Sequence, residues 1–292
     1  MEIEREIKQE IKRLKELNKP HIHGRNILAK LKKWPSLSNS QRKQLQTVVR
    51  EYKKWKDDNE KLVGYSKYIL KRRVKLLNKY KNEIENVDFS AQSKFHSSVI
   101  EEFLYYLFKD LLDELNEKID NNARNANKIL LGGIRAYSNL YFAPKNLADF
   151  VRNANMKINE KDQDFAIHRS ILIKADNEKR EVNVPVVSIE CKTYIDKTML
   201  EGSIATAEKI KSGNPYCLFL VVTEWYDVSY EVDPAYSRID QIYVLRKQKR
   251  KANKNNPINY TVVNDLFEFV KYHLERDWSN IEQKLTETGK IL

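Results

Sequence analysis

Two acidic residues and one lysine have the types and spacing for metal-assisted hydrolysis. Glu190 and Lys192 end an apolar, β-branched run at residues 182–189 that predicts a strand. Side chains two residues apart on a strand point to the same face, and Asp164, at the start of the preceding predicted strand, can join them from a paired neighbour. Carboxylate oxygens are ligands that Mg²⁺ prefers, and the lysine helps to position or activate water. These residues therefore predict a Mg²⁺-dependent site for phosphodiester hydrolysis.

The Glu-x-Lys triplet alone is weak evidence, because lysine is abundant in this sequence. The same triplet begins at Glu6, Glu10, Glu51 and Glu282, each time within a helical pattern. Glu190 differs because it stands at the polar end of a buried strand, after an acid-bearing strand and before a helix and a second buried strand. This context favours a catalytic role over an exposed surface pair.

The elements that must position these residues predict an α/β fold. Strand patterns and helical patterns follow one another from residue 165 onwards, and the run at 216–222 is apolar without alternation, as in a strand covered on both faces. We expect a mixed β-sheet flanked by helices. The predicted strands cover residues 165–173, 182–189, 216–222 and 239–245, and the predicted helices cover residues 197–211 and 265–274.

The excess positive charge lies in the first third of the chain. Residues 1–90 contain 24 Lys and Arg against 12 Asp and Glu, which accounts for the whole net charge of +12 and leaves 29 of each sign elsewhere. Apolar residues there recur at helical spacing, and Ser38, Asn39 and Ser40 are candidate N-caps. A one-sided basic segment is the expected footprint of polyanion binding, although a solvated helical surface has the same composition. We therefore expect a basic, helical DNA-binding region over residues 1–88 and a nuclease domain over residues 89–292.

A second basic run follows the last predicted strand. We expect its side chains to contact backbone phosphates of double-stranded DNA, with a merely solvated loop as the alternative. The residues assigned to this contact are Arg246, Lys247, Lys249, Arg250 and Lys251.

The composition predicts a cytoplasmic protein with no membrane segment. No stretch approaches the ~20 apolar residues that span a bilayer, and the charged N-terminus lacks the apolar middle of a signal peptide. The two cysteines, Cys191 and Cys217, both lie in apolar runs. Buried thiols in a reducing compartment fit this pattern better than a disulfide does.

The arrangement of Asp164, Glu190 and Lys192 resembles the PD-(D/E)XK nucleases, whose pattern is an acid, a gap, and then acid-x-lysine on the next strand. The stretch ECKTYIDKTMLEGSIATAEKIKSGNPYCLFLVVT, which begins at Glu190, is similar to type II restriction endonucleases of the Bpu-type group. The resemblance covers about residues 89–250. Gln163 replaces the proline that usually precedes the first acid, so Asp162 competes with Asp164 for that role; Asp164 is preferred because it directly precedes the apolar strand.

The resemblance also implies a further glutamate from the preceding helix, which is predicted at about residues 91–118. The apolar stripe of this helix centres on Leu104, Leu107 and Leu111. Glu101 flanks the stripe and is the expected catalytic and metal-binding residue, with an ordinary exposed glutamate as the alternative. Glu102 lies nearly opposite the stripe and is expected to be solvated.

The resemblance implies a type II restriction endonuclease that hydrolyses double-stranded DNA at a specific sequence with Mg²⁺. Because one such site cuts one strand, a homodimer or a heterodimer with a related subunit is expected. The alternatives are a structure-selective repair nuclease and a non-catalytic DNA-binding protein of the same fold. The intact set of Asp164, Glu190 and Lys192 counts against the non-catalytic alternative.

Overall fold

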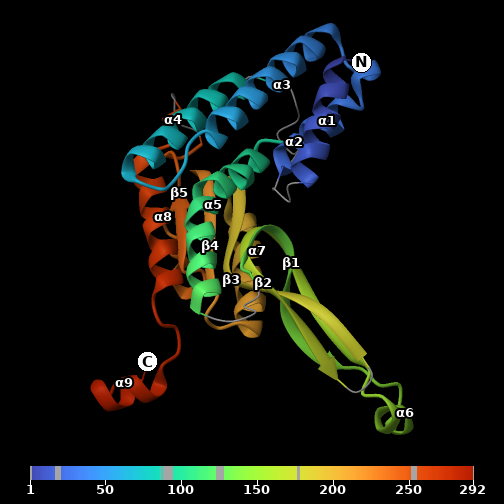
Figure 1. Ribbon diagram of the computed structural model, residues 1–292, viewed down its shortest axis with the longest axis vertical. Helices are drawn as coiled ribbons and strands as arrows, with labels where there is room; N and C mark the ends of the chain where they lie inside the picture. Colours follow the sequence, from blue (N-terminus) through green and yellow to red (C-terminus); the bar gives the residue numbers. More distant parts are fainter. Residues whose placement is uncertain are drawn as a thin grey trace.

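A five-stranded mixed sheet lies at the centre of the fold (Figure 1). The computed structural model describes residues 2–291 except 17–20, 86, 88–94, 123–127, 176–177 and 251–254. The strands follow the order β1-β2-β3-β4-β5, with antiparallel pairing from β1 to β3 and parallel pairing from β3 to β5. Their bounds are Leu130–Phe142 for β1, Met156–Ala175 for β2, Glu178–Ile195 for β3, Leu218–Tyr226 for β4 and Gln241–Val244 for β5.

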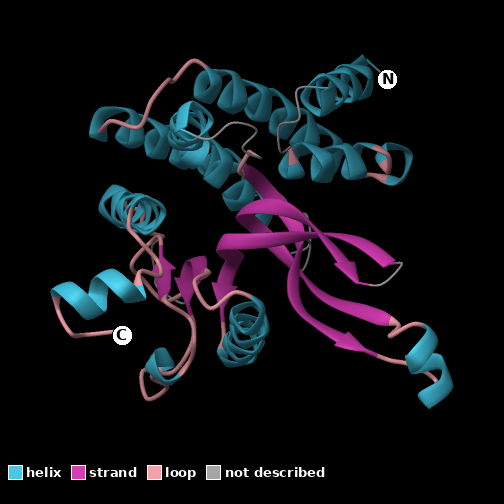
Figure 2. Cartoon of the chain, turned by 60° about the horizontal axis from the view of Figure 1, so that its bottom comes forward, coloured by secondary structure: helices cyan, strands magenta, loops and turns pink. Residues whose placement is uncertain are grey.

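Helices cover both faces of this sheet, which confirms the predicted α/β fold (Figure 2). Helices α5 and α8 pack on one face with the N-terminal helices beyond them, and α7 packs on the other face. The N-terminal helices are α1 (Glu2–Glu16), α2 (Ile22–Leu31), α3 (Asn39–Glu60) and α4 (Lys67–Ile84). The others are α5 (Ser97–Asn122), α6 (Leu147–Arg152), α7 (Lys197–Gly213), α8 (Tyr260–Glu275) and α9 (Ile281–Glu287). Within the described residues, no helix is both long enough and apolar enough to cross a membrane.

Local sequence signals fix the ends of the helices that matter most for the site. Of the three candidate N-caps, Ser38 is the one that caps α3: its side chain accepts a hydrogen bond from the backbone of Gln41, whose side chain accepts one from the backbone of Ser38. Asp196 caps α7, and that helix ends at Gly213. A Cβ at Gly213 would lie 2.1 Å from the carbonyl oxygen of Ser138 in β1, so the close approach of helix and strand requires glycine.

A single apolar cluster joins the N-terminal helices to the sheet. It contains buried residues of α1 to α4, the apolar stripe of α5, one face of the sheet and the buried side of α8. A second cluster lies between the other face of the sheet and α7. The N-terminal helices therefore share their core with the sheet, and the functional division at residue 88 remains a prediction.

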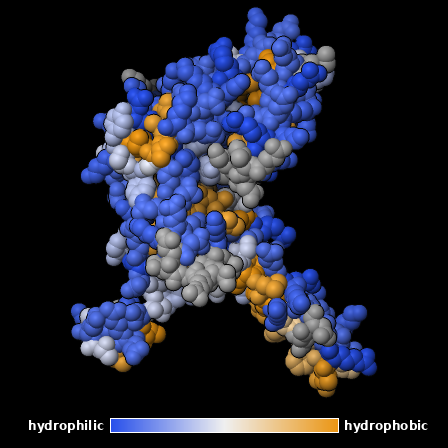
Figure 3. All heavy atoms as spheres, in the orientation of Figure 1, coloured by the Kyte–Doolittle hydropathy of each residue, from blue (hydrophilic) through white to orange (hydrophobic). Residues whose placement is uncertain are grey.

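The structure contains elements that the sequence patterns did not predict. β2 is one strand of 20 residues, and its first half pairs with β1 to form a ribbon that projects from the body and ends in α6 (Figure 1). We call residues 137–160 the ribbon arm. Its tip exposes apolar side chains, visible in Figure 3, among them Leu147, Phe150 and Val151. Because most side chains of this ribbon are at least partly exposed, it lacks the periodicity that marks a half-buried strand.

Candidate active site

The register of β2 and β3 brings the predicted acids and lysine together. Phe165 pairs with Ile189 in the antiparallel ladder, so Asp164 lies next to Glu190. Lys192 Nζ is 3.4 Å from Glu190 Oε2 and 4.0 Å from Asp164 Oδ2. The three side chains therefore converge where the strands leave the buried part of the sheet.

Both carboxylates are held by further hydrogen bonds. The backbone N–H of Cys191 donates to Asp164 Oδ2 at 2.9 Å, and the Ser203 hydroxyl of α7 donates to Glu190 Oε2 at 2.6 Å. Sequence reasoning missed Ser203, which is fully buried. The sequence pattern that could have identified Ser203 is its position within the apolar stripe of α7, three residues after Leu200 and four before Ala207. A buried hydroxyl at such a position needs a polar partner, and here the partner is Glu190.

The site is semi-enclosed and strongly polarised. The side chains of Glu190, Asp164 and Lys192 are 10%, 20% and 31% exposed. Burial lowers the pKa of Lys192, but the charges of Glu190 and Asp164 raise it by more, so its net pKa shift is upward. Burial also raises the pKa of the Cys191 thiol, with smaller contributions from Asp164 and Glu101. Lys192 is therefore a protonated hydrogen-bond donor beside two carboxylates.

The competing acid Asp162 lies apart from this group. Its side chain is 91% exposed, and its nearest cation is Arg135, with 4.0 Å between Asp162 Oδ1 and Arg135 Nε. Asp164 is thus the acid of this strand that lies beside Lys192.

The prediction that Glu102 is solvated is wrong. Glu102 is fully buried, and it accepts hydrogen bonds from the Tyr52 hydroxyl at 2.8 Å and from the backbone N–H groups of His23 and Gly24 at 3.0 and 3.4 Å. The reason is that α5 has the sheet on one side and the N-terminal helices on the other, so no side of it at this level faces water.

Glu101 is also buried, at 4% exposure, on the face of α5 near Cys191. Within the described residues, no three His, Cys, Asp or Glu side chains lie close enough together to hold a metal ion. The structure therefore places Asp164 and Glu190 together and leaves Glu101 outside direct contact distance of a shared ion.

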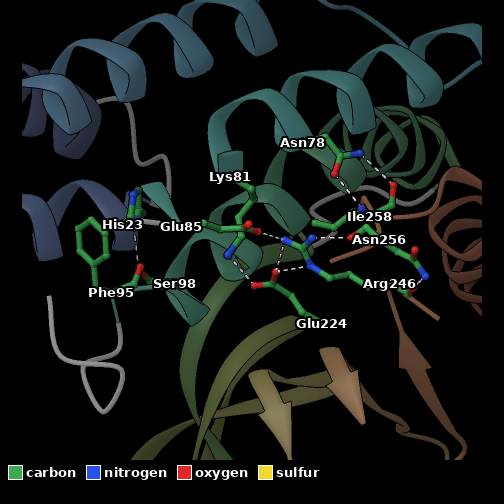
Figure 4. A network of polar contacts seen from close by, with 10 residues as sticks. All are labelled: His23, Asn78, Lys81, Glu85, Phe95, Ser98, Glu224, Arg246, Asn256 and Ile258. Carbon is green, nitrogen blue, oxygen red and sulfur yellow. Dashed lines mark hydrogen bonds and ion pairs between the residues drawn. The ribbon is translucent and has the colours of Figure 1, made fainter. Parts of the chain in front are cut away.

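The prediction that Arg246 contacts DNA is wrong. Arg246 is 2% exposed, and its guanidinium donates to the buried Glu224 at 2.9 Å, to the carbonyl oxygen of Asn256 at 2.6 Å, and to Glu85 (Figure 4). With these partners the side chain is not available to a phosphate. Glu224, which also binds Lys81 Nζ at 2.6 Å, is the partner that the sequence did not reveal.

The other basic residues of this run that the structure describes are more accessible. Lys247 and Arg250 are exposed and Lys249 is partly buried. Lys249 Nζ lies 3.9 Å from the ring centroid of Tyr230, and Arg250 Cζ lies 4.1 Å from that of Tyr194. Lys251 is outside the described residues.

Comparison with known proteins identifies the family of the chain. The family model of the Bpu10I restriction endonuclease matches residues 92–278. A chain of the native BbvCI A2B2 tetramer has a similar fold, with a TM-score of 0.66 and 21% sequence identity over 88% of this chain and 96% of that chain. No sequence among the curated proteins matches. Since the family model spans more than half of the sequence, the chain belongs to the Bpu10I restriction endonuclease family.

Proposed function

We propose that this restriction endonuclease hydrolyses phosphodiester bonds of double-stranded DNA at a specific sequence, with Mg²⁺ and with a PD-(D/E)XK site formed by Asp164, Glu190 and Lys192. The observation that carries the proposal is the position of Lys192 Nζ between the two carboxylates, 3.4 Å from Glu190 and 4.0 Å from Asp164. A lysine and two acids that converge from adjacent strands provide both ligands for a cation and a donor for an oxyanion.

The donor set fits Mg²⁺. This ion usually keeps several waters and binds through one or two carboxylates together with phosphate oxygens, so it needs no closed cage of protein ligands. Asp164 and Glu190 would hold it, and their partial exposure leaves room for water and for DNA. Glu101, predicted as a third ligand, would act on the ion through a bound water. When bound, Mg²⁺ supplies charge stabilisation and a more acidic water.

The protein itself orients the groups that would act on the substrate. Ser203 and the backbone of Cys191 fix the two carboxylates, so little reorganisation is needed when the substrate arrives. Lys192 donates hydrogen bonds to the attacking water or to a phosphate oxygen, where its charge opposes the negative charge of the transition state.

We propose that two basic parts of the chain bind the DNA. The first is the N-terminal helical region, residues 1–88, whose α2 begins at Ile22 beside β1: a Cβ at Gly133 would be 3.6 Å from Ile22 Cδ1 and 3.1 Å from the carbonyl oxygen of Asp164. The second is the loop that carries Lys247, Lys249, Arg250 and Lys251. Phosphate contacts from both would position the duplex over the carboxylates.

We further propose that the chain works as a dimer, because one site of this kind cuts one strand. A homodimer and a heterodimer with a related subunit both satisfy this requirement. The similar fold of BbvCI, described as an A2B2 tetramer, supports pairing with a related subunit.

Incubation of the purified protein with plasmid and phage DNA, with Mg²⁺ or with EDTA, tests the function. Discrete fragments only with Mg²⁺ are the expected result, and sequencing of their ends gives the recognition site. Smears on random-sequence DNA would instead indicate a structure-selective nuclease. Salt-sensitive binding without cleavage, also after addition of the related subunit, would indicate a non-catalytic DNA-binding protein.

A further inference from the structure

A short cationic loop lies across the end of the strand that carries Lys192. In this loop, residues 246–250, the guanidinium of Arg250 stacks on Tyr194, with 4.1 Å between Cζ and the ring centroid. Tyr194 follows Lys192 by two residues on β3, a spacing along a strand of about 7 Å. The charge of Arg250 is thus placed close to the proposed catalytic group.

A buried network fixes the first end of this loop (Figure 4). Glu224, which is fully buried, accepts hydrogen bonds from Lys81 Nζ at 2.6 Å and Arg246 Nε at 2.9 Å. The Arg246 side chain also donates to the carbonyl oxygen of Asn256 at 2.6 Å, across the base of the loop. Breaking one member of such a network leaves a buried charge unpaired, which resists movement of the loop.

The second end of the loop is fixed to β3 itself. The backbone N–H of Arg250 donates to Asp227 Oδ1 at 3.1 Å, and the backbone N–H of Asp227 donates to the carbonyl oxygen of Ile195 at 2.8 Å. The position of Arg250 relative to Lys192 is therefore set by the strand and not only by side-chain packing.

The chemistry of Arg250 suits a phosphate. Its guanidinium is exposed, and within the described residues no carboxylate forms an ion pair with it. A guanidinium that lies flat on an aromatic ring keeps its edge N–H groups free to form two parallel hydrogen bonds with phosphate oxygens. The ring limits its rotamers before DNA arrives, which lowers the entropy cost of binding.

We propose that Arg250, held on Tyr194, binds a phosphate of the cut strand close to the scissile phosphate, and that Glu224 is a positioning residue that acts on this contact through Arg246. This inference rests on the proposed function, because it assumes that Asp164, Glu190 and Lys192 mark the scissile position.

DNA affinity without Mg²⁺ provides a first test that does not depend on cleavage. For Arg250→Ala we expect affinity to fall about 10-fold or more and the slope of log affinity against log salt to decrease by about 1. Tyr194→Phe keeps the ring and should behave like the wild type, whereas Tyr194→Ala should approach Arg250→Ala. Arg276→Ala is the matched control, since Arg276 also lies over a tyrosine, Tyr272, at 5.6 Å, but at the far end of α8.

The position of the contact can be read with neutral methylphosphonates placed one at a time on the cut strand. In the wild type one position near the cut should weaken binding as much as Arg250→Ala does, and in Arg250→Ala that position should have no further effect. Equal, additive losses at every position in both proteins would overturn the proposal.

Cleavage kinetics distinguish a positioning role of Glu224 from a role in the chemical step. Glu224→Gln should raise KM several-fold with little change in kcat, and a loss of kcat with unchanged KM would contradict a positioning role. If the wild type cleaves and Arg250→Ala matches it in affinity and salt slope, the inference fails while the proposed function stands. If the wild type does not cleave but the salt slope still decreases, the proposed chemistry fails while the phosphate contact stands.

Discussion

At the scale of single residues, Lys192 is the side chain on which the proposed chemistry depends most. For Lys192→Ala we expect cleavage to fall by about 10²–10³-fold or more, because the donor opposite the developing charge is lost. DNA affinity should change little, since the basic loop and the N-terminal helices are untouched. Plasmid cleavage and an electrophoretic mobility shift measure the two effects.

Lys284→Ala is the matched control for this substitution. Lys284 ends the same Glu-x-Lys triplet, but on the exposed helix α9. Full activity in Lys284→Ala together with its loss in Lys192→Ala ties function to position in the sheet. Retained cleavage in Lys192→Ala would move the active site elsewhere.

Glu102 makes stability depend on pH. Burial raises the pKa of Glu102 from its ordinary value of 4.5 to about 7, against smaller opposing effects of the Tyr52 hydroxyl and the backbone of α2. The contribution of Glu102 to the free energy of unfolding is therefore greatest below pH 4.5, and it is lost as the pH rises towards 7. Glu102→Gln removes the charge, so at pH 8 we expect the variant to be more stable by up to about 3 kcal/mol, with little difference near pH 5.

Thermal unfolding of the two proteins at pH 5 and pH 8 checks this expectation. Glu117→Gln, at an exposed position of the same helix α5, serves as the control. An equal difference in stability at both pH values would mean that Glu102 ionises normally in the folded protein.

At the scale of elements, α7 supports the proposed active site. Its Ser203 donates a hydrogen bond to Glu190, so Ser203→Ala leaves a proposed ligand carboxylate less constrained. By analogy with outer-shell ligands in general, we expect the Mg²⁺ concentration for half-maximal cleavage to rise about 10-fold. Ser212→Ala on the same helix, whose hydroxyl donates to the carbonyl oxygen of Lys209, should leave it unchanged. A lower kcat at saturating Mg²⁺ with an unchanged half-maximal concentration would argue against this role.

Part of the fold was predictable from the sequence, because some elements have a clear local signal and others depend on distant partners. The strand that carries Glu190 is recognisable because the run before this residue is buried and β-branched, and a polar pair directly after such a run points to function. The burial of Arg246 was not predictable, because its partners Glu224 and Glu85 are 22 and 161 residues away and a basic run does not show which of its cations is paired. Likewise, the apolar stripe of α5 shows in which direction Glu102 points, but it does not show that a second layer of helices covers this residue.

At the scale of the whole molecule, the shared core predicts that the nuclease part cannot stand alone. Leu45 and Leu77 of the N-terminal helices belong to the same buried cluster as Phe103 and Leu107 of α5. A fragment of residues 89–292 would expose that surface, and we expect it to be insoluble or to lack a cooperative thermal transition. Circular dichroism of the fragment against the full chain measures this. A cooperative transition would support an independent domain that begins near residue 89.

Unlike the N-terminal helices, the tip of the ribbon arm does not share the apolar core of the molecule. No residue of α6 is buried, and neither apolar cluster includes a residue between 137 and 155. The tip of the arm around α6 is exposed and lies outside both clusters, and a segment of this kind tolerates insertion. The arm is therefore a natural attachment point for a fluorophore or a fused domain, through which the enzyme could be tracked or tethered without disturbing the strands that hold its carboxylates.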